Sequence, residues 1–94
     1  MDKTAEVIRR AEDFDAGRAQ VERAVLAVLY LDRSARAGRG LMESQMAAQA
    51  DLAADDVRLA LDVLAEQGQV EAIGVYWRIT ARGVLAFRKG SAHG

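Results

Sequence analysis

The stretch from Leu41 to Gly83 constrains the fold more than any other part of the chain, because the spacing of its apolar residues changes from helical to alternating. Helical spacing predicts a short helix over residues 43–50 and a second helix from Ala54 to about Gln67. Residues 51–53 form the turn between them, and Gly68 is a natural stop for the second helix. The inward face of this second helix is predicted to carry Val57, Ala60, Leu61 and Leu64.

Alternating apolar residues between Val70 and Ile79 predict a β-hairpin. A two-residue turn of type II′ at residues 74–75 pairs Ile73 with Tyr76. Residues 41–42 can form a short strand beside this hairpin. The register assigns one face to the core, with Val70, Ala72, Trp77 and Ile79, and leaves the other face outside, with Glu71, Ile73, Tyr76 and Arg78.

Helices are also predicted on the N-terminal side of this stretch. Apolar residues at helical spacing (Val7, Ile8, Ala11 and Phe14) predict an amphipathic helix over residues 3–13, and the Asp-Ala-Gly sequence at 15–17 is predicted to break it. The next helix, over residues 18–34, is apolar on two faces, so its own domain or a partner must cover both. Residues 34–40, which are small apart from Arg36 and Arg39, are predicted to form a loop.

On the C-terminal side, Thr80 is placed to cap a last helix over residues 81–89. This helix is predicted to bury Val84 and Leu85, with Phe87 beside them, before a frayed tail. We therefore predict a mostly helical α+β fold with an N-terminal helical segment (1–17), one domain (18–89) and a disordered tail (90–94).

The composition excludes several classes of function. The chain has no Cys, which excludes disulfides, thiolate metal sites and thiol nucleophiles. Its one His, His93, lies in the tail, and no Gly-rich phosphate loop follows a strand, so we expect neither an enzyme nor a cofactor or metal site. The longest apolar run, Ala24 to Leu31, is too short to span a bilayer, and the N-terminus lacks the form of a signal peptide. These features predict a cytoplasmic protein that does not bind membranes.

Charge is distributed in blocks along the chain. Residues 41–72 hold seven carboxylates against one cation, Arg58, for a net charge of −6. Residues 18–40 carry +3 and residues 73–94 carry +4. We therefore expect a surface with distinct acidic and basic regions.

Three segments carry a resemblance to a known family. Residues 52–61 are similar to a turn and recognition helix, 64–70 to a helix-to-strand junction, and 76–83 to the strand and helix start that follow a wing. With these segments, residues 18–89 resemble the winged-helix family of bacterial transcriptional regulators, especially its MarR-like and PadR-like forms. The resemblance implies a winged helix-turn-helix in which helix 54–67 enters the major groove of duplex DNA, the hairpin touches the DNA backbone or minor groove, and flanking helices dimerise the protein.

Under this DNA-binding hypothesis, Arg58 is the one residue of the recognition helix able to read a guanine bidentately. It could equally form a salt bridge to Asp62 or Asp55 on the same helix. Leu59 shares the outward face with these acids. Cations on the two flanks are expected to grip phosphates: Arg33, Arg36 and Arg39 from the loop, and Arg78 and Arg82 from the hairpin side.

The alternative hypothesis is a winged helix that binds another protein and does not touch DNA. Its acidic recognition helix would dock a basic partner, because carboxylates repel a polyanion and attract a cationic surface. The residues expected to meet the partner are Leu59, Ile73, Tyr76, Asp55, Asp56 and Asp62. The two hypotheses are separated by whether carboxylates line the exposed face of helix 54–67 once the chain has folded.

Apolar helix surface in excess of what one small core can hide predicts a homodimer. We expect the dimer to form through residues 3–13, the second face of helix 18–34 and the C-terminal helix.

Overall fold

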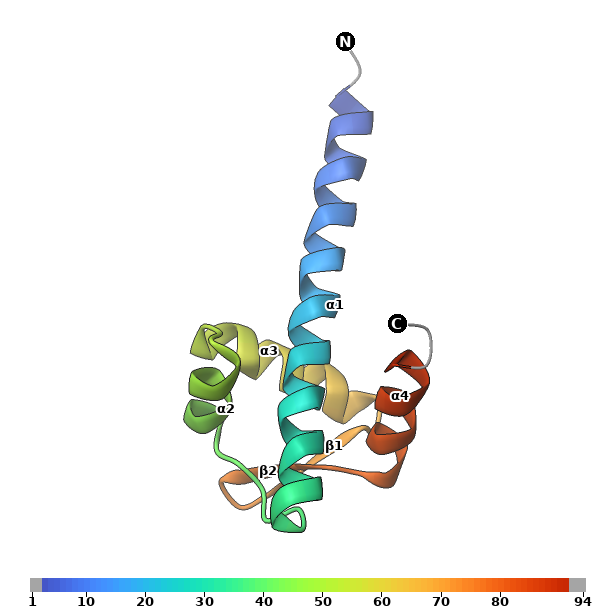
Figure 1. Cartoon of the computed structure of the whole chain (residues 1–94). Helices are drawn as coiled ribbons and strands as arrows, with labels where there is room; N and C mark the ends of the chain where they lie inside the picture. Colours follow the sequence, from blue (N-terminus) through green and yellow to red (C-terminus); the bar gives the residue numbers. More distant parts are fainter. Residues whose placement is uncertain (1–2, 92–94) are drawn as a thin grey trace.

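The computed structural model describes residues 3–91, and within this range the chain forms four helices and one two-stranded antiparallel sheet (Figure 1). The mostly helical α+β class is as predicted. The elements in chain order are α1 (Lys3–Arg36), α2 (Glu43–Ala50), α3 (Ala54–Glu66), β1 (Val70–Ile73), β2 (Tyr76–Ile79) and α4 (Ala81–Ser91). The predicted frayed tail was wrong at its start, because α4 includes residues 90 and 91, and His93 lies outside the described residues.

Helix α1 is continuous over 34 residues, so the predicted break at residues 15–17 was wrong, and the helix runs through the predicted domain boundary between residues 17 and 18. A helical Gly costs only about 1 kcal/mol relative to Ala, and the chain has no Pro that could interrupt the helix. A Cβ added at Gly17 would meet no atom within 4 Å, so no neighbouring element forces a turn there. The N-terminal half of α1 therefore projects from the body of the protein (Figure 1).

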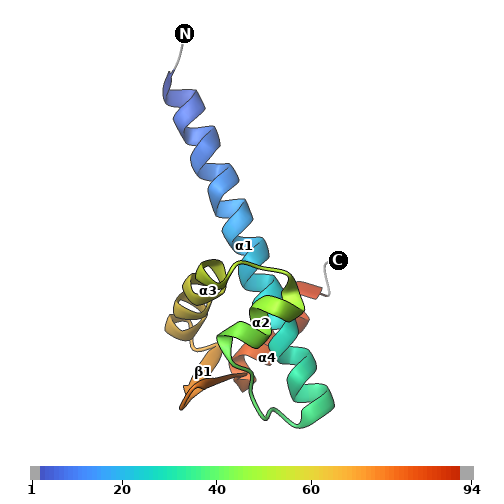
Figure 2. The same cartoon turned by 90° about the vertical axis from the view of Figure 1, so that its left-hand side faces the viewer.

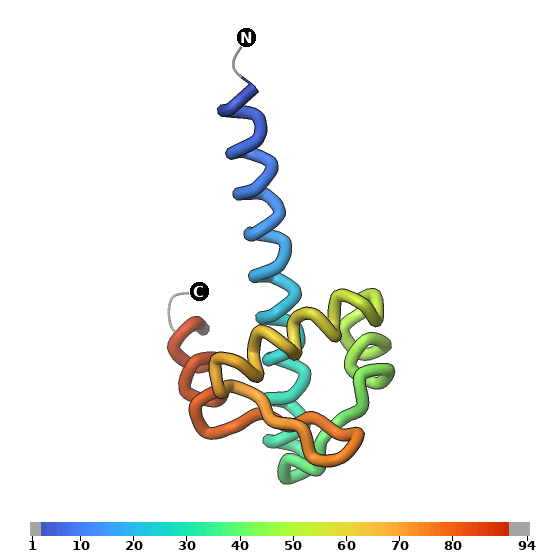
Figure 3. The backbone as a smooth tube through the Cα atoms, turned by 180° about the vertical axis from the view of Figure 1, so that it is seen from behind, coloured from blue at the N-terminus to red at the C-terminus, as the bar shows by residue number. Residues whose placement is uncertain are grey.

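The hydrophobic core lies where the C-terminal half of α1 meets α2 and α3. From behind, α3 crosses α1 near the middle of that helix (Figure 3). The predicted inward face of α3 is confirmed, since Val57, Ala60, Leu61 and Leu64 are all buried. They pack in one cluster with Val25, Val28 and Leu29 of α1, Met46 of α2 and Leu41.

Helix α4 covers the second apolar face of α1. Leu26 is buried, and the ring of Tyr30 lies 4.7 Å from that of Phe87. Of the residues predicted to be buried on α4, Val84 is buried and Phe87 is half-buried, but Leu85 is exposed. The chain itself therefore supplies most of the cover for this face of α1.

The hairpin has the predicted register, which pairs Val70 with Ile79 and Ile73 with Tyr76. Gly74 takes a positive φ of 63°, as the first position of a type II′ turn requires. Leu41 forms an isolated β-bridge with Trp77. The short strand predicted at residues 41–42 is therefore reduced to one residue.

The predicted core face of this hairpin is covered only at one end. Val70 and Ile79 are buried, but Ala72 is exposed and Trp77 is half-buried. Assigning Ala72 and Trp77 fully to the core was wrong. Val70 and Ile79 lie at the end of the hairpin next to α3 and α4, whereas Ala72 and Trp77 lie toward its turn.

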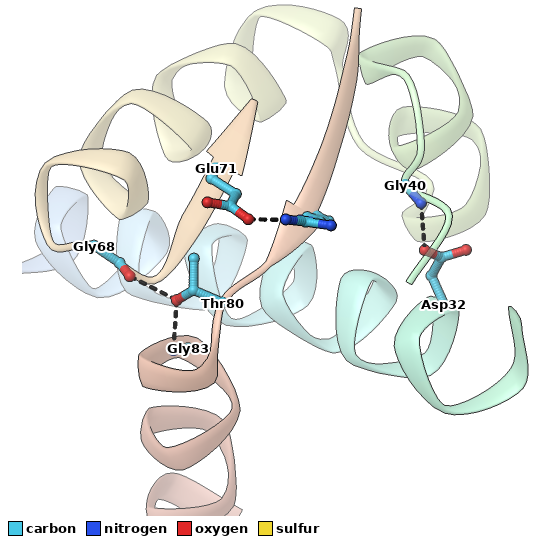
Figure 4. A network of polar contacts seen from close by, with 7 residues as sticks. Asp32, Gly40, Gly68, Glu71, Thr80 and Gly83 are labelled. Atoms are coloured by element: carbon cyan, nitrogen blue, oxygen red, sulfur yellow. Dashed lines mark hydrogen bonds and ion pairs between the residues drawn. The ribbon is translucent and has the colours of Figure 1, made fainter. Parts of the chain in front are cut away.

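Thr80 joins the hairpin to α4 and caps that helix as predicted. Its hydroxyl donates to the carbonyl of Gly68 (2.6 Å) and accepts the N–H of Gly83 (3.1 Å), as Figure 4 shows. A Cβ at Gly83 would lie 2.1 Å from the carbonyl oxygen of Gln69. Only Gly therefore allows the first turn of α4 to pack this closely against the end of α3.

Candidate interaction surface

The exposed face of α3 is lined by carboxylates. Asp55, Asp56, Asp62 and Glu66 are all exposed in the folded chain. Asp55 and Asp56 stand in the first turn, where they interact favourably with the helix dipole, and Ala53 at the N-cap makes no side-chain hydrogen bond. Folding therefore leaves negative charge at the helix end where backbone N–H groups would otherwise attract a phosphate.

Arg58, the only cation in the sequence of α3, is engaged by carboxylates. Its Nη1 lies 3.2 Å from Oε1 of Glu43 on α2, and its Nε lies 3.7 Å from Oδ1 of Asp62. The contact with Asp62 is one of the salt bridges foreseen as the alternative to base reading. Exposed ion pairs of this kind contribute about 0–1 kcal/mol to stability, but they hold the guanidinium against its own domain.

Arg78 is held in the same way on the hairpin. It lies directly opposite Glu71 in the antiparallel register, and its Nε lies 2.5 Å from Oε1 of Glu71 (Figure 4). The cation predicted to contact phosphate from the hairpin is therefore paired across the two strands. Arg82, also assigned to this flank, has its side chain beside Gly68 at the end of α3.

The three remaining arginines assigned to DNA lie around the C-terminus of α1. Arg33 and Arg36 are in its last turn, and Arg39 is in the loop that follows. Figure 2 shows this end of α1 at the lower right and α3 at the left, so the structure does not bring these arginines together with the exposed face of α3. The loop itself begins three residues later than predicted, because α1 continues to Arg36.

Asp32 anchors this loop and was not identified from the sequence. Its side chain is 3% exposed, Oδ2 accepts the N–H of Gly40 at 2.9 Å (Figure 4), and Nη1 of Arg36 lies 3.7 Å from Oδ1. Oδ1 itself makes no hydrogen bond among the described residues. Its position on the apolar face of α1, four residues after Val28, is the sequence signal that could have revealed a buried carboxylate.

The predicted partner-binding residues do not form one patch. Ile73 and Tyr76 pair beside the hairpin turn and are about half exposed. Leu59, 61% exposed, lies instead in a groove between α3 and α1. The structure therefore divides the predicted apolar surface between the hairpin and this groove.

This groove was not predicted, because the predicted break of α1 at residues 15–17 includes Gly17, which lines it. Its apolar lining comes from Phe14 and Val21 of α1 and from Leu59 and Val63 of α3. The other charged or small groups that line it are Asp13, Gly17, Arg18, Glu22, Asp56 and Asp62. Four carboxylates against one cation make it acidic.

Comparison with protein-family models, with curated proteins and with solved structures gave no match. Within residues 3–91, no group of His, Asp and Glu side chains is arranged to hold a metal ion. No helix in the same part of the chain has both the length and the apolar character needed to cross a bilayer. The function is therefore argued from the surfaces described above.

Proposed function

We propose that the chain is a winged-helix module that acts by binding another protein, with the exposed face of α3 docking a basic surface of that partner. The order of helices, hairpin and last helix supports the winged-helix assignment, as does the bridge from Leu41 to the hairpin, which occupies the place of the third strand of a wing.

The observation that carries the proposal is the charge on α3 after folding. Asp55, Asp62 and Glu66 face solvent on its outer side, while Arg58 is drawn toward α2 by Glu43. Residues 43–66 have a net charge of −5. A polyanion brought to this face would be repelled, whereas a cationic protein surface would be attracted over roughly one Debye length, about 8 Å at physiological salt. Such complementarity mainly raises the association rate and the specificity.

The family resemblance and the basic segments at the two ends of the domain support the duplex-DNA hypothesis. Under this second proposal, contacts would come from Arg33, Arg39 and Arg82, with base reading by Arg58. Arg58 would first have to leave Glu43, and the loop arginines lie away from α3. The contacts of the folded chain therefore favour the protein-binding proposal.

The test is a titration of the whole chain with two probes, a lysine-rich helical peptide and a random-sequence DNA duplex, followed by NMR chemical shifts. We expect the peptide to shift resonances of Asp55, Asp62 and Glu66, with an affinity that falls as salt rises. The double change D55N/E66Q should weaken peptide binding several-fold by removing two of the attracting charges. The matched control E6Q/D15N removes the same charge from the projecting half of α1 and should leave these shifts unchanged.

The opposite result would support the DNA proposal. If the duplex binds with a steep salt dependence and shifts α3, and if D55N/E66Q strengthens that binding, the module reads DNA despite its acidic helix. Arg58→Ala should then cost about 1–3 kcal/mol of discrimination at one base position.

A further inference from the structure

We propose that the projecting half of α1 pairs antiparallel with the same segment of a second copy of the chain, so that the N-terminal turns of each α1 lie in the α1–α3 groove of the other. This inference does not rest on the proposed function, although the groove shares Asp62 with the face of α3 that we propose to bind a basic partner. It replaces the broader dimer surface expected from the sequence with one defined segment, residues 3–22.

The first argument is the apolar character of one helix face. Apolar residues recur along one face of α1 at intervals of three, four or seven residues, and Arg18 occupies the position between Phe14 and Val21. At the C-terminal end of this stripe Val25 and Val28 are buried in the core, but at its N-terminal end Val7 is 63% and Phe14 is 65% exposed. The members of the stripe are Val7, Ala11, Phe14, Val21, Val25 and Val28.

The second argument is that this face has no cover within the chain. Every residue from 3 to 20 is exposed. Figures 1 and 3 show this part of α1 standing clear of the other elements. It is about 27 Å long at 1.5 Å per residue. Most helices in proteins owe their stability to packing of an apolar face, so a stripe of this length needs a partner of helical shape.

The third argument is charge complementarity, which identifies that partner. Residues 3–10 carry a net charge of +2, and residues 12–22 carry −3. Antiparallel pairing with Phe14 over the partner's Ala11 places residues 3–10 against residues 15–22, which carry a net charge of −1, whereas parallel pairing places like charges together. Asp56 and Asp62 of α3 add to the acidic side of the groove, where the partner's Lys3 would arrive. The segment is therefore complementary to its own inverted copy.

Side-chain size specifies the register. Large residues pack well against small ones at facing positions, and antiparallel pairing can place Phe14 over the partner's Ala11. The guanidinium of Arg18 is 5.9 Å from the centre of the Phe14 ring, at the side of this contact. The same register puts the partner's Thr4 opposite Val21 and the partner's Val7 beside Leu59. The groove then receives the partner's N-terminal turn, whose apolar residues are Ala5 and Val7.

The first experiment measures association of the whole chain by sedimentation at micromolar concentration, and we expect a dimer. Phe14→Glu should weaken self-association by more than about tenfold, since buried aromatic residues dominate such interfaces. Leu85→Glu is the matched control, because Leu85 is 68% exposed but lies on α4, outside the proposed interface. A monomeric intact chain, or a dimer disrupted by Leu85→Glu and not by Phe14→Glu, would overturn the proposal.

The second experiment tests the antiparallel register and uses the absence of Cys from the chain. Mixing Thr4→Cys and Val21→Cys chains under mild oxidation should give a disulfide between the two different chains. Thr4→Cys alone should not crosslink, because the two N-terminal turns lie at opposite ends of the pair. A homodimeric Thr4→Cys disulfide would show parallel pairing. Circular dichroism of each variant confirms that it has folded.

Discussion

The two halves of α1 carry apolar residues on one face, interrupted by Arg18, yet the body of the protein covers only one half. Val25, in the C-terminal half, is fully buried, whereas Val7, in the N-terminal half, is 63% exposed. The two residues have the same side chain and lie on the same face of the same helix. The comparison teaches that periodicity identifies the face of a helix that can be buried, while the neighbouring elements decide whether it is.

The largest expected effect comes from truncating one Val in each half. Val25→Ala removes two buried methyl groups and leaves a cavity, so it should lower the free energy of unfolding by about 2–3 kcal/mol. Val7→Ala should change it by less than about 0.5 kcal/mol. The free energy of unfolding is measured by urea denaturation at a protein concentration at which the chain is monomeric. Equal effects would mean that the projecting half is packed against something within its own chain.

Two aspartates, one in each half of α1, allow the same comparison between a buried and an exposed polar side chain. Asp32→Ala removes the acceptor of the Gly40 N–H and should cost about 1–3 kcal/mol, because a buried donor is left unpaired. Asp15→Ala, on the exposed half, should stay within about 0.5 kcal/mol of the wild type. Hydrogen exchange of the Gly40 amide provides a local readout. Unchanged protection in Asp32→Ala would show that the bridge between Leu41 and Trp77 holds this loop without Asp32.

A substitution at Gly17, which lies between the two halves of α1, tests the comparison of these halves further. Gly17→Ala should increase the helicity of α1 and stabilise the chain by about 0.5–1 kcal/mol, because Ala is the better helix former and space is open around this position. Circular dichroism and thermal unfolding measure the gain. A loss of stability would instead indicate that α1 bends at Gly17, as the sequence reading expected.

The smallest expected effect concerns the salt bridges of the acidic face. Arg58→Ala should destabilise the chain by less than about 1 kcal/mol, since both of its ion pairs are exposed. High salt should reduce even this difference between variant and wild type. A cost above about 2 kcal/mol would mean that Arg58 joins α2 to α3 more strongly than its exposure suggests.

Prediction from the sequence succeeded where a local pattern carried the information. The inward residues of α3, the pairing of the hairpin and the Thr80 cap were all predicted, because each follows from helical spacing, strand alternation or a side chain that bonds a nearby backbone group. It failed at residues 15–17, where a turn-forming composition lay between strong helix formers. A mild local preference against helix did not stop propagation from an already folded helix.

What the sequence by itself determined about this protein is therefore the positions of α2, α3 and the two strands, the hairpin register and the acidic charge of α3. Only the tertiary structure decided which groups meet across the chain: Arg58 with Glu43 of α2, and Asp32 with the loop after α1. It also decided that α4 covers Tyr30 while Phe14 stays exposed. The physical reason is that periodicity and capping act over a few residues, whereas burial and ion pairing depend on which distant segments the fold brings side by side.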